Sequence, residues 1–204
     1  LQSDAIVLPG FIDEHIHGAG GSDAMDGTIK DLSVIASTVC KEGTTAFLAT
    51  TMTQSRENIL KAMQTVKEYR KACPEDGAEI LGVHLEGPFI CPKPGAVGAH
   101  NPAAVLQPSP QALNELWEIA QGKVKLLTLA AGLDGSIETI KAAKKLGITV
   151  SLGHQLANTD DLIAASEAGA TLLTHLGNGI PNSIDRHRNP IWSGLANDAL
   201  TAMI

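Results

Sequence analysis

The sequence has little positive charge, few aromatic residues (3%) and no long hydrophobic run. Its 204 residues include 15 Lys and Arg against 22 Asp and Glu, a formal net charge of -7 at pH 7. No basic field is available to hold nucleic acid or an anionic membrane, so we expect neither partner. No apolar run approaches the roughly 20 residues that cross a bilayer. Leu1 to Asp4 lack the features of a signal peptide, so we expect a cytoplasmic protein.

Cysteine is also scarce. Cys40, Cys73 and Cys91 are an odd number at wide spacing, which fits neither a disulfide framework nor a cysteine-based zinc site. We expect reduced, partly buried thiols. The hydrophobic share of 44% and the charged share of 18% are ordinary for a globular protein with a sizeable core.

Short β-type runs alternate with longer helical ones. Runs rich in Val, Ile, Leu or Thr predict strands at Ile6 to Ile12, Thr44 to Ala49, Ile80 to Leu85, Val124 to Leu129, Thr149 to Leu152 and Leu172 to His175. Helical periodicity and capping residues predict helices that begin near Thr28, Ser55, Ser109, Ser136 and Thr159. Such alternation predicts a parallel α/β sheet, either doubly wound or closed as a barrel of eight βα units.

Three glycines support this division of the chain. Gly43, Gly147 and Gly169 each stand between a helical pattern and a strand that is entered through threonine. Glycine at that place suits the left-handed residue that ends a helix, so we expect a positive φ at all three.

Polar residues cluster where the predicted strands end. The residues concerned are Asp13, His15 and His17 after the first strand, Glu86 after the third, His154 after the fifth and His175 at the sixth. In a barrel all these strand ends face one rim, where active sites of this fold are built. The cluster therefore favours the barrel over the doubly wound sheet.

These side chains are the types that bind metal. His15 and His17 are two apart, so on an extended strand both imidazoles point the same way. Glu86 is delivered by an apolar strand into a Gly-Pro turn, and a buried carboxylate needs a cation or hydrogen-bond partner. With His154 and His175, the set can hold two ions with the Glu as a bridge. Zinc suits these ligands best, while iron, manganese or cobalt would also fit. Such a site lowers the pKa of bound water and points to hydrolysis of a polar bond such as an amide.

Several segments together resemble a known family. They are 9–18 (PGFIDEHIHG), 84–89 (HLEGPF), 98–102 (GAHNP), 153–154 (GH) and 174–178 (THLGN). They are similar to the N-acetylglucosamine-6-phosphate deacetylase family of the amidohydrolase superfamily, over nearly the whole chain. The resemblance implies a metal-dependent hydrolase with a (β/α)8 TIM-type barrel that removes the acetyl group from N-acetylglucosamine 6-phosphate, giving glucosamine 6-phosphate and acetate.

The resemblance also implies roles for single residues. Glu86, His154 and His175 would hold one divalent ion, and His15 with His17 would add a second. His100, which alone could be a solvated loop histidine, would contact the substrate and polarise its acetyl carbonyl.

The sugar phosphate would be bound by the segment after the last metal-binding histidine. Asn178 and Gly179 match the family's substrate contacts. Arg186 matches an arginine that reaches the phosphate from the neighbouring subunit of a homodimer, and a guanidinium suits a phosphate. The alternative is that Arg186 is a surface residue of the charged loop 185–188.

The family barrel extends beyond this chain. We expect residues 1–204 to form a partial barrel of about six βα units, with strands 1 to 6 and the start of strand 7. Strands 7 and 8, the catalytic Asp at the end of strand 8 and a small β domain would be missing. Residues 1–204 alone are then not expected to hydrolyse an acetamide at an enzymatic rate. The alternatives are an amidohydrolase acting on another acetamido sugar or a cyclic amide, and a non-catalytic metal-binding fragment.

Overall fold

The main sheet is parallel and follows the order of the chain. The computed structural model describes residues 6–72 and 76–203. Seven strands lie in the order β1-β4-β5-β6-β7-β8-β9, each parallel to its neighbour. Their bounds are Phe11–Ile16, Thr44–Thr51, Glu79–Glu86, Val124–Leu129, Thr149–Leu152, Leu172–Leu173 and Thr201–Ala202.

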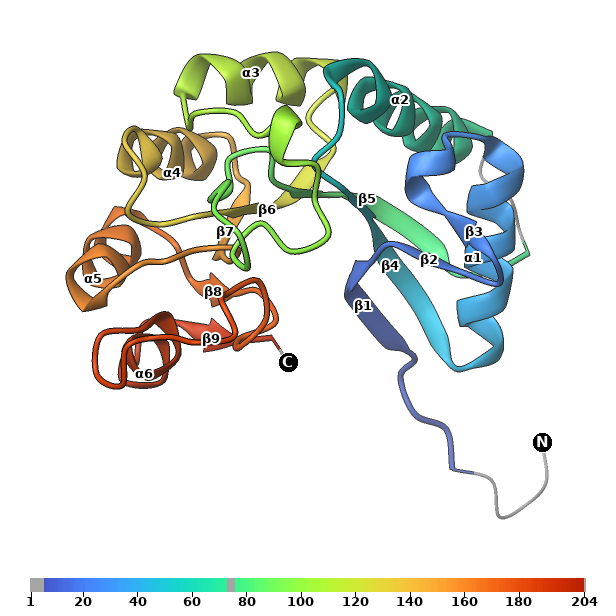
Figure 1. Ribbon diagram of the computed structural model, residues 1–204. Coiled ribbons are helices and arrows are strands. Elements are labelled where there is room, and N and C mark those ends of the chain that lie inside the picture. Colours follow the sequence, from blue (N-terminus) through green and yellow to red (C-terminus); the bar gives the residue numbers. More distant parts are fainter. Residues whose placement is uncertain (1–5, 73–75, 204) are drawn as a thin grey trace.

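A helix connects each of these strands to the next and lies on the outside of the curled sheet (Figure 1). In order they are α1 Ile29–Lys41, α2 Arg56–Ala72, α3 Pro110–Ile119, α4 Ser136–Lys145, α5 Thr159–Ala168 and α6 Pro190–Leu195. A doubly wound sheet reverses its strand order and carries helices on both faces. Because neither occurs here, the structure is the barrel type, with β1 and β9 as the edges of the sheet that is described.

The core lies between the sheet and the inner faces of the helices. Helix α1 buries Leu32, Ile35, Ala36 and Val39, the face predicted from the sequence. Its first turn is capped by Thr28, whose hydroxyl accepts from the Asp31 amide at 3.1 Å. Side-chain oxygens do the same at the starts of α2, α3, α5 and α6, which satisfies amides that have no partner inside the helix, whereas α4 begins after Gly135 without a side-chain cap.

The glycine prediction is confirmed. Gly43, Gly147 and Gly169 have φ of 92°, 74° and 123° where α1, α4 and α5 end. A side chain would be strained at these angles, so glycine allows the chain to turn from each helix directly into the next strand.

The first predicted strand is displaced. Instead of Ile6 to Ile12, β1 spans Phe11–Ile16, because its partner β4 begins only at Thr44, opposite Phe11. Residues 6–10 therefore extend past the end of the sheet, and their apolar side chains are exposed. Asp13 and His15 consequently lie within the strand rather than after it.

The last predicted strand is shorter than expected, because β8 ends at Leu173 and the chain turns at His175, whose φ is 32°. The sequence also did not predict α6 or the small hairpin of β2 (Gly18–Ala19) and β3 (Ser22–Asp23). These elements are too short to show a hydrophobic period.

The structure describes two of the three cysteines. Cys40 is exposed and Cys91 is buried, both as free thiols, while Cys73 lies outside the described residues. In the described part of the chain, no helix has both the length and the apolarity needed to cross a membrane.

Candidate metal centre

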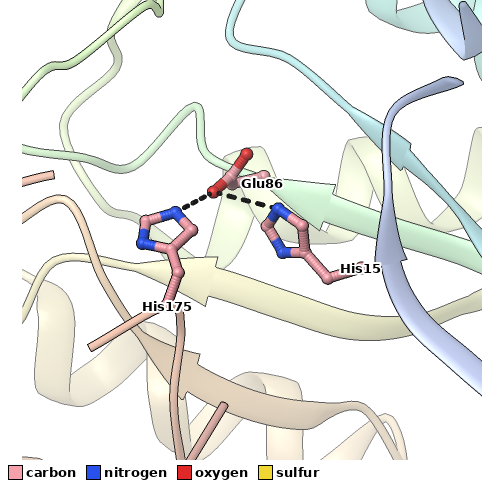
Figure 2. A group of neighbouring side chains, drawn as sticks. All are labelled: His15, Glu86 and His175. Atoms are coloured by element: carbon pink, nitrogen blue, oxygen red, sulfur yellow. Dashed lines mark hydrogen bonds and ion pairs between the residues drawn. The ribbon is translucent and has the colours of Figure 1, made fainter. Parts of the chain in front are cut away.

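Glu86 is the centre of the site. It is the last residue of β5, and its side chain is only 1% exposed. Its Oε1 lies 3.0 Å from His175 Nε2, 3.2 Å from His154 Nε2 and 3.8 Å from His15 Nε2. Figure 2 shows the imidazoles of His15 and His175 side by side, both turned toward the carboxylate of Glu86. His15 and His175 are 71 and 89 residues from Glu86 in the sequence. The order of the strands brings both close to Oε1 of Glu86.

The second carboxylate oxygen of Glu86 faces two more imidazoles. Oε2 lies 3.1 Å from His17 Nε2 and 3.4 Å from His100 Nε2. All five predicted histidines, the four candidate metal ligands and His100, therefore surround the carboxylate of Glu86. Two subsets have ligand atoms close enough to share one ion, namely Glu86 with His15 and His175, and Glu86 with His100 and His154.

The backbone is strained at two of these positions. His154 follows β7 and His175 follows β8, and both have a left-handed φ, of 51° and 32°. Such angles are uncommon in residues other than glycine, and they concentrate at functional sites because the surrounding structure must hold them. The left-handed turn directs each imidazole back over the end of its strand toward Glu86.

Hydrogen bonds decide which nitrogen of His154 carries the proton. Its Nδ1 lies 2.8 Å from the carbonyl oxygen of Ala96, and a carbonyl can only accept, so Nδ1 carries the hydrogen. The lone pair of Nε2 then faces Glu86 Oε1 at 3.2 Å. Two acceptors at this distance repel unless a cation or proton lies between them. The donor set therefore fits a divalent metal.

The same argument gives the opposite result for His100. Its Nδ1 accepts a hydrogen bond from the backbone N–H of Thr53 at 2.9 Å. In the neutral ring the hydrogen is then on Nε2, the nitrogen that faces Glu86. A metal ligand needs a free lone pair there, so His100 fits a hydrogen-bond donor rather than a ligand.

The electrostatics of the cluster favour an ionised Glu86 carboxylate beside a neutral His15 ring. Burial by itself raises the pKa of Glu86, but the surrounding imidazoles, His100 foremost, hold that pKa far below its usual range through their contacts with the carboxylate. Burial lowers the pKa of His15 to about 4, despite the nearby charge of Glu86. A neutral imidazole beside an anionic carboxylate is the state that binds a cation.

His17 differs from its neighbour on the strand. Burial lowers its pKa, but the hydrogen bond to Glu86 and the charge of that carboxylate outweigh burial and raise the pKa above the usual value. The carboxylate thus favours the protonated form of His17, and a cation bound beside Glu86 would compete with that proton.

A cavity of about 540 Å³ opens directly above the cluster. Asn178 and Gly179, predicted to bind substrate, both line it, as does His100. Arg186 does not line it and is exposed on the loop that precedes α6. Within one chain the structure thus brings together every predicted site residue except Arg186.

Two glycines hold the His154 ring in place. A Cβ at Gly179 would lie 2.7 Å from His154 Nδ1, and a Cβ at Gly98 would lie 3.0 Å from its Cε1. The two loops that carry them can pack on the imidazole only because neither has a side chain. Gly179 therefore has a role in shaping the site that its sequence position alone did not reveal.

The sequence analysis overlooked His84 as a residue of the site. It lies on β5 two residues before Glu86, so the period of a strand places both on the same face. Its ring is fully buried with its centre 4.8 Å from that of His15. The two-residue spacing from Glu86 was the signal that could have found it.

The parallel barrel-type sheet and the imidazoles around a buried carboxylate at its carboxyl edge define a metal-dependent hydrolase barrel. The chain belongs to the amidohydrolase family, whose model matches residues 6–187. Membership of this family implies a divalent metal, in agreement with the donor set around Glu86.

The curated proteins that resemble this chain include sugar-phosphate deacetylases. The chain is 42% identical over 201 residues to the N-acetylglucosamine-6-phosphate deacetylase of Bacillus subtilis, covering 96% of this chain and 50% of that protein. It is 32% identical over 195 residues to the N-acetylgalactosamine-6-phosphate deacetylase of Escherichia coli O157:H7, covering 95% and 51%. The chain therefore spans about half the length of the curated relatives it matches.

Solved structures agree with this assignment. The N-acetylglucosamine-6-phosphate deacetylase of Thermotoga maritima superposes with a TM-score of 0.81 at 31% identity, covering 95% of this chain and 50% of that one. A variant of the Mycobacterium smegmatis enzyme in complex with N-acetyl-D-glucosamine-6-phosphate gives the same TM-score at 28% identity, covering 95% and 49%. These neighbours confirm the predicted fold class.

Proposed function

We propose that this chain forms the metal-binding part of an enzyme that deacetylates N-acetylglucosamine 6-phosphate, with acetate and glucosamine 6-phosphate as products. The observation that carries the proposal is the cluster of imidazoles around the buried carboxylate of Glu86, below a cavity large enough for a sugar. The names of the relatives supply the substrate class.

In this proposal Glu86 would be shared by two divalent ions, with zinc as the preferred metal. His154 and His175 complete one subsite, and His15 and His17 complete the other. A divalent ion bound there supplies Lewis-acid activation of water and of the amide carbonyl. The residues that line the cavity would position the acetamide above Glu86.

His100 is proposed to donate its Nε2 hydrogen to the acetyl carbonyl oxygen as negative charge develops there. The Thr53 amide, by occupying Nδ1, supports this orientation of the proton. The ring is nearly fully buried, so the donor is fixed before substrate binds and costs no reorganisation during the reaction.

Replacing His100 tests this role. In a chain extended to the length of its relatives, we expect His100→Ala to lower kcat by about 10²- to 10³-fold, the usual cost of losing one oxyanion donor. KM and metal content should change little. His100→Gln, which can place an N–H near the position of Nε2, should recover part of the loss. A loss of metal equal to that of His154→Ala would instead identify His100 as a ligand.

Arg186 is proposed to bind the phosphate of a substrate held by the partner subunit of a homodimer. Within one chain Arg186 is exposed and outside the cavity, whereas Asn178 and Gly179 line it. This arrangement is what a contribution in trans requires, and the guanidinium can bind phosphate through two parallel hydrogen bonds.

The phosphate role predicts a selective effect on KM. Arg186→Ala should raise KM for the phosphorylated sugar by about 10-fold or more, the value of a charge-assisted hydrogen bond, and leave the unphosphorylated sugar unaffected. Arg188→Ala, two residues further along the same exposed loop, is the matched control. Equal losses on both sugars would contradict the role of Arg186.

Turnover of three substrates distinguishes the proposed function from the alternative activities. Turnover should be fastest on N-acetylglucosamine 6-phosphate, slower on N-acetylgalactosamine 6-phosphate and slowest on N-acetylglucosamine. The galactosamine substrate is included because one relative carries that name. Preference for an unphosphorylated sugar or a cyclic amide would favour the other amidohydrolase activities. The cytoplasmic location stays a prediction from the sequence.

A further inference from the structure

Strand β1 contains a bulge at the point where it enters the metal centre. Asp13 is opposite Phe47 of β4 and Ile16 is opposite Ala49, so three steps along β1 match two along β4. The extra residue lies between Asp13 and Ile16, in the Glu14-His15 segment. Bulges are frequent beside active sites because they redirect a side chain, and this one comes immediately before the His15-Ile16-His17 segment.

Side chains, one from β1 itself and one each from β4 and β5, satisfy the backbone groups that the bulge removes from regular pairing. The His15 N–H donates to Asp13 Oδ1 at 3.0 Å, and the Ile16 N–H donates to Thr50 Oγ1 at 2.9 Å. The Glu14 carbonyl accepts a hydrogen bond from His84 Nδ1 at 2.9 Å. The irregular shape of β1 is therefore held by contacts with three different side chains.

The contact from His84 is oriented by a chain of buried hydroxyl groups. Because the Glu14 carbonyl can only accept, Nδ1 of the neutral ring carries the hydrogen and Nε2 is an acceptor. Thr128 Oγ1, 2.7 Å from Nε2, must then donate to it. Thr128 accepts in turn from Thr174 at 2.7 Å, and Thr174 accepts from Ser151 at 2.6 Å.

This network runs beneath Glu86 and joins the strands that carry the candidate ligands. Thr128 belongs to β6 and Ser151 to β7, while Thr174 directly precedes His175. All four side chains of the network are buried. Hydrogen bonds in a chain, in which each group accepts one bond and donates the next, polarise and strengthen one another in a low-dielectric interior. The network thus fixes His84, and His84 fixes β1 at the bulge.

We propose that His84 is a positioning residue, which aims His15 and His17 at Glu86 by holding the carbonyl of Glu14. This inference rests on the metal centre proposed above and assigns to His84 no contact with metal or substrate. The edge-to-face packing of the His84 and His15 rings, with centres 4.8 Å apart, adds a second restraint on His15. Loss of the contact with the Glu14 carbonyl weakens the subsite of His15 and His17 and leaves that of His154 and His175 in place.

Two substitutions distinguish the contact made by Nδ1 of His84 from the contact made by its Nε2. In His84→Asn the amide nitrogen can take the place of Nδ1 and still donate to the Glu14 carbonyl. In His84→Gln the longer side chain places its amide near Nε2, beside Thr128, and the Glu14 carbonyl loses its donor. The wild type and both variants are stripped of metal, titrated with Zn²⁺, and analysed for bound metal and for affinity in each of two binding steps.

We expect the wild type to bind two Zn²⁺, and we expect His84→Asn to match the affinity of the wild type in each binding step. In His84→Gln one of the two steps should lose about 10- to 100-fold in affinity, the usual effect of removing a group that orients a ligand, while the other step changes little. Equal two-step binding by His84→Gln and the wild type would overturn the positioning role. A wild type that binds one ion or none would contradict the two-ion centre itself and this inference with it.

Thr50→Val provides an independent test should His84→Gln fail to fold, as judged by circular dichroism. This nearly isosteric change removes the acceptor of the Ile16 N–H from the same bulge. It should weaken the same binding step by a similar factor. Unchanged binding in Thr50→Val would show that the shape of the bulge does not control the subsite, and would overturn the inference.

Discussion

Glu86→Ala is expected to lose most of the bound metal. Both carboxylate oxygens take part in the cluster, Oε1 toward His175 and His154 and Oε2 toward His17. Removing the carboxylate therefore removes a ligand from both proposed subsites and the negative charge that offsets the cations. In an extended chain, deacetylase activity should fall by about 10³-fold or more, because Lewis-acid activation contributes several kcal/mol.

Elemental analysis of the purified protein measures the metal content. Glu79→Ala is the matched control, because Glu79 begins the same strand β5 but is exposed at its other end. That variant should keep the full metal content. If Glu86→Ala and the wild type had equal metal content, the assignment of Glu86 as the bridging ligand would be wrong.

Residues 1–204 alone are expected to bind metal but to hydrolyse the acetamide slowly. The sheet of the described residues has edges at β1 and β9, and Phe11 and Ile12 on β1 are 72% and 62% exposed. The resemblance assigns proton transfer to an Asp on an eighth strand. The loss of general acid and base catalysis typically costs about 10²- to 10⁴-fold, so we expect an activity lower by that factor than in an extended chain.

The measurement compares kcat for residues 1–204 and for a chain of the relatives' length at equal metal occupancy. Similar rates would show that a proton-transfer group lies within these residues. Asp23 would then be the first candidate, because its side chain lines the cavity together with Glu86. Asp23→Asn in the shorter chain would test that explanation, and a loss of activity there would contradict the role given to the eighth strand.

Local patterns were sufficient for most of the fold. Strands β6 and β7 have the predicted bounds, and α3 begins at Pro110 after its predicted cap Ser109. These elements combine a clear period with capping or turn residues, so their local sequence determines them. The predicted His and Glu residues also meet, since parallel strands present their carboxyl ends at one edge of the sheet.

The remaining features depend on contacts between distant parts of the chain. The first strand is displaced because its length is set by where β4 begins, not by the apolar run of residues 6–10. The bulge at Glu14 depends on Thr50 and His84, which are 34 residues from Ile16 and 70 residues from Glu14. A hydrophobic period cannot report such contacts, so neither the bulge nor the role of His84 was predicted.

In residues 1–204 taken alone, the position of β1 at the edge of the described sheet is expected to affect how the centre releases metal. An edge strand is hydrogen-bonded to one neighbour only, whereas β5 and β7 have a neighbour on each side. Local opening of β1 therefore costs less free energy, and its backbone amides should exchange with solvent faster. His15 and His17 move with that strand. A chelator would then remove zinc in two phases, a fast one from the subsite of His15 and His17 and a slow one from the subsite of His154 and His175.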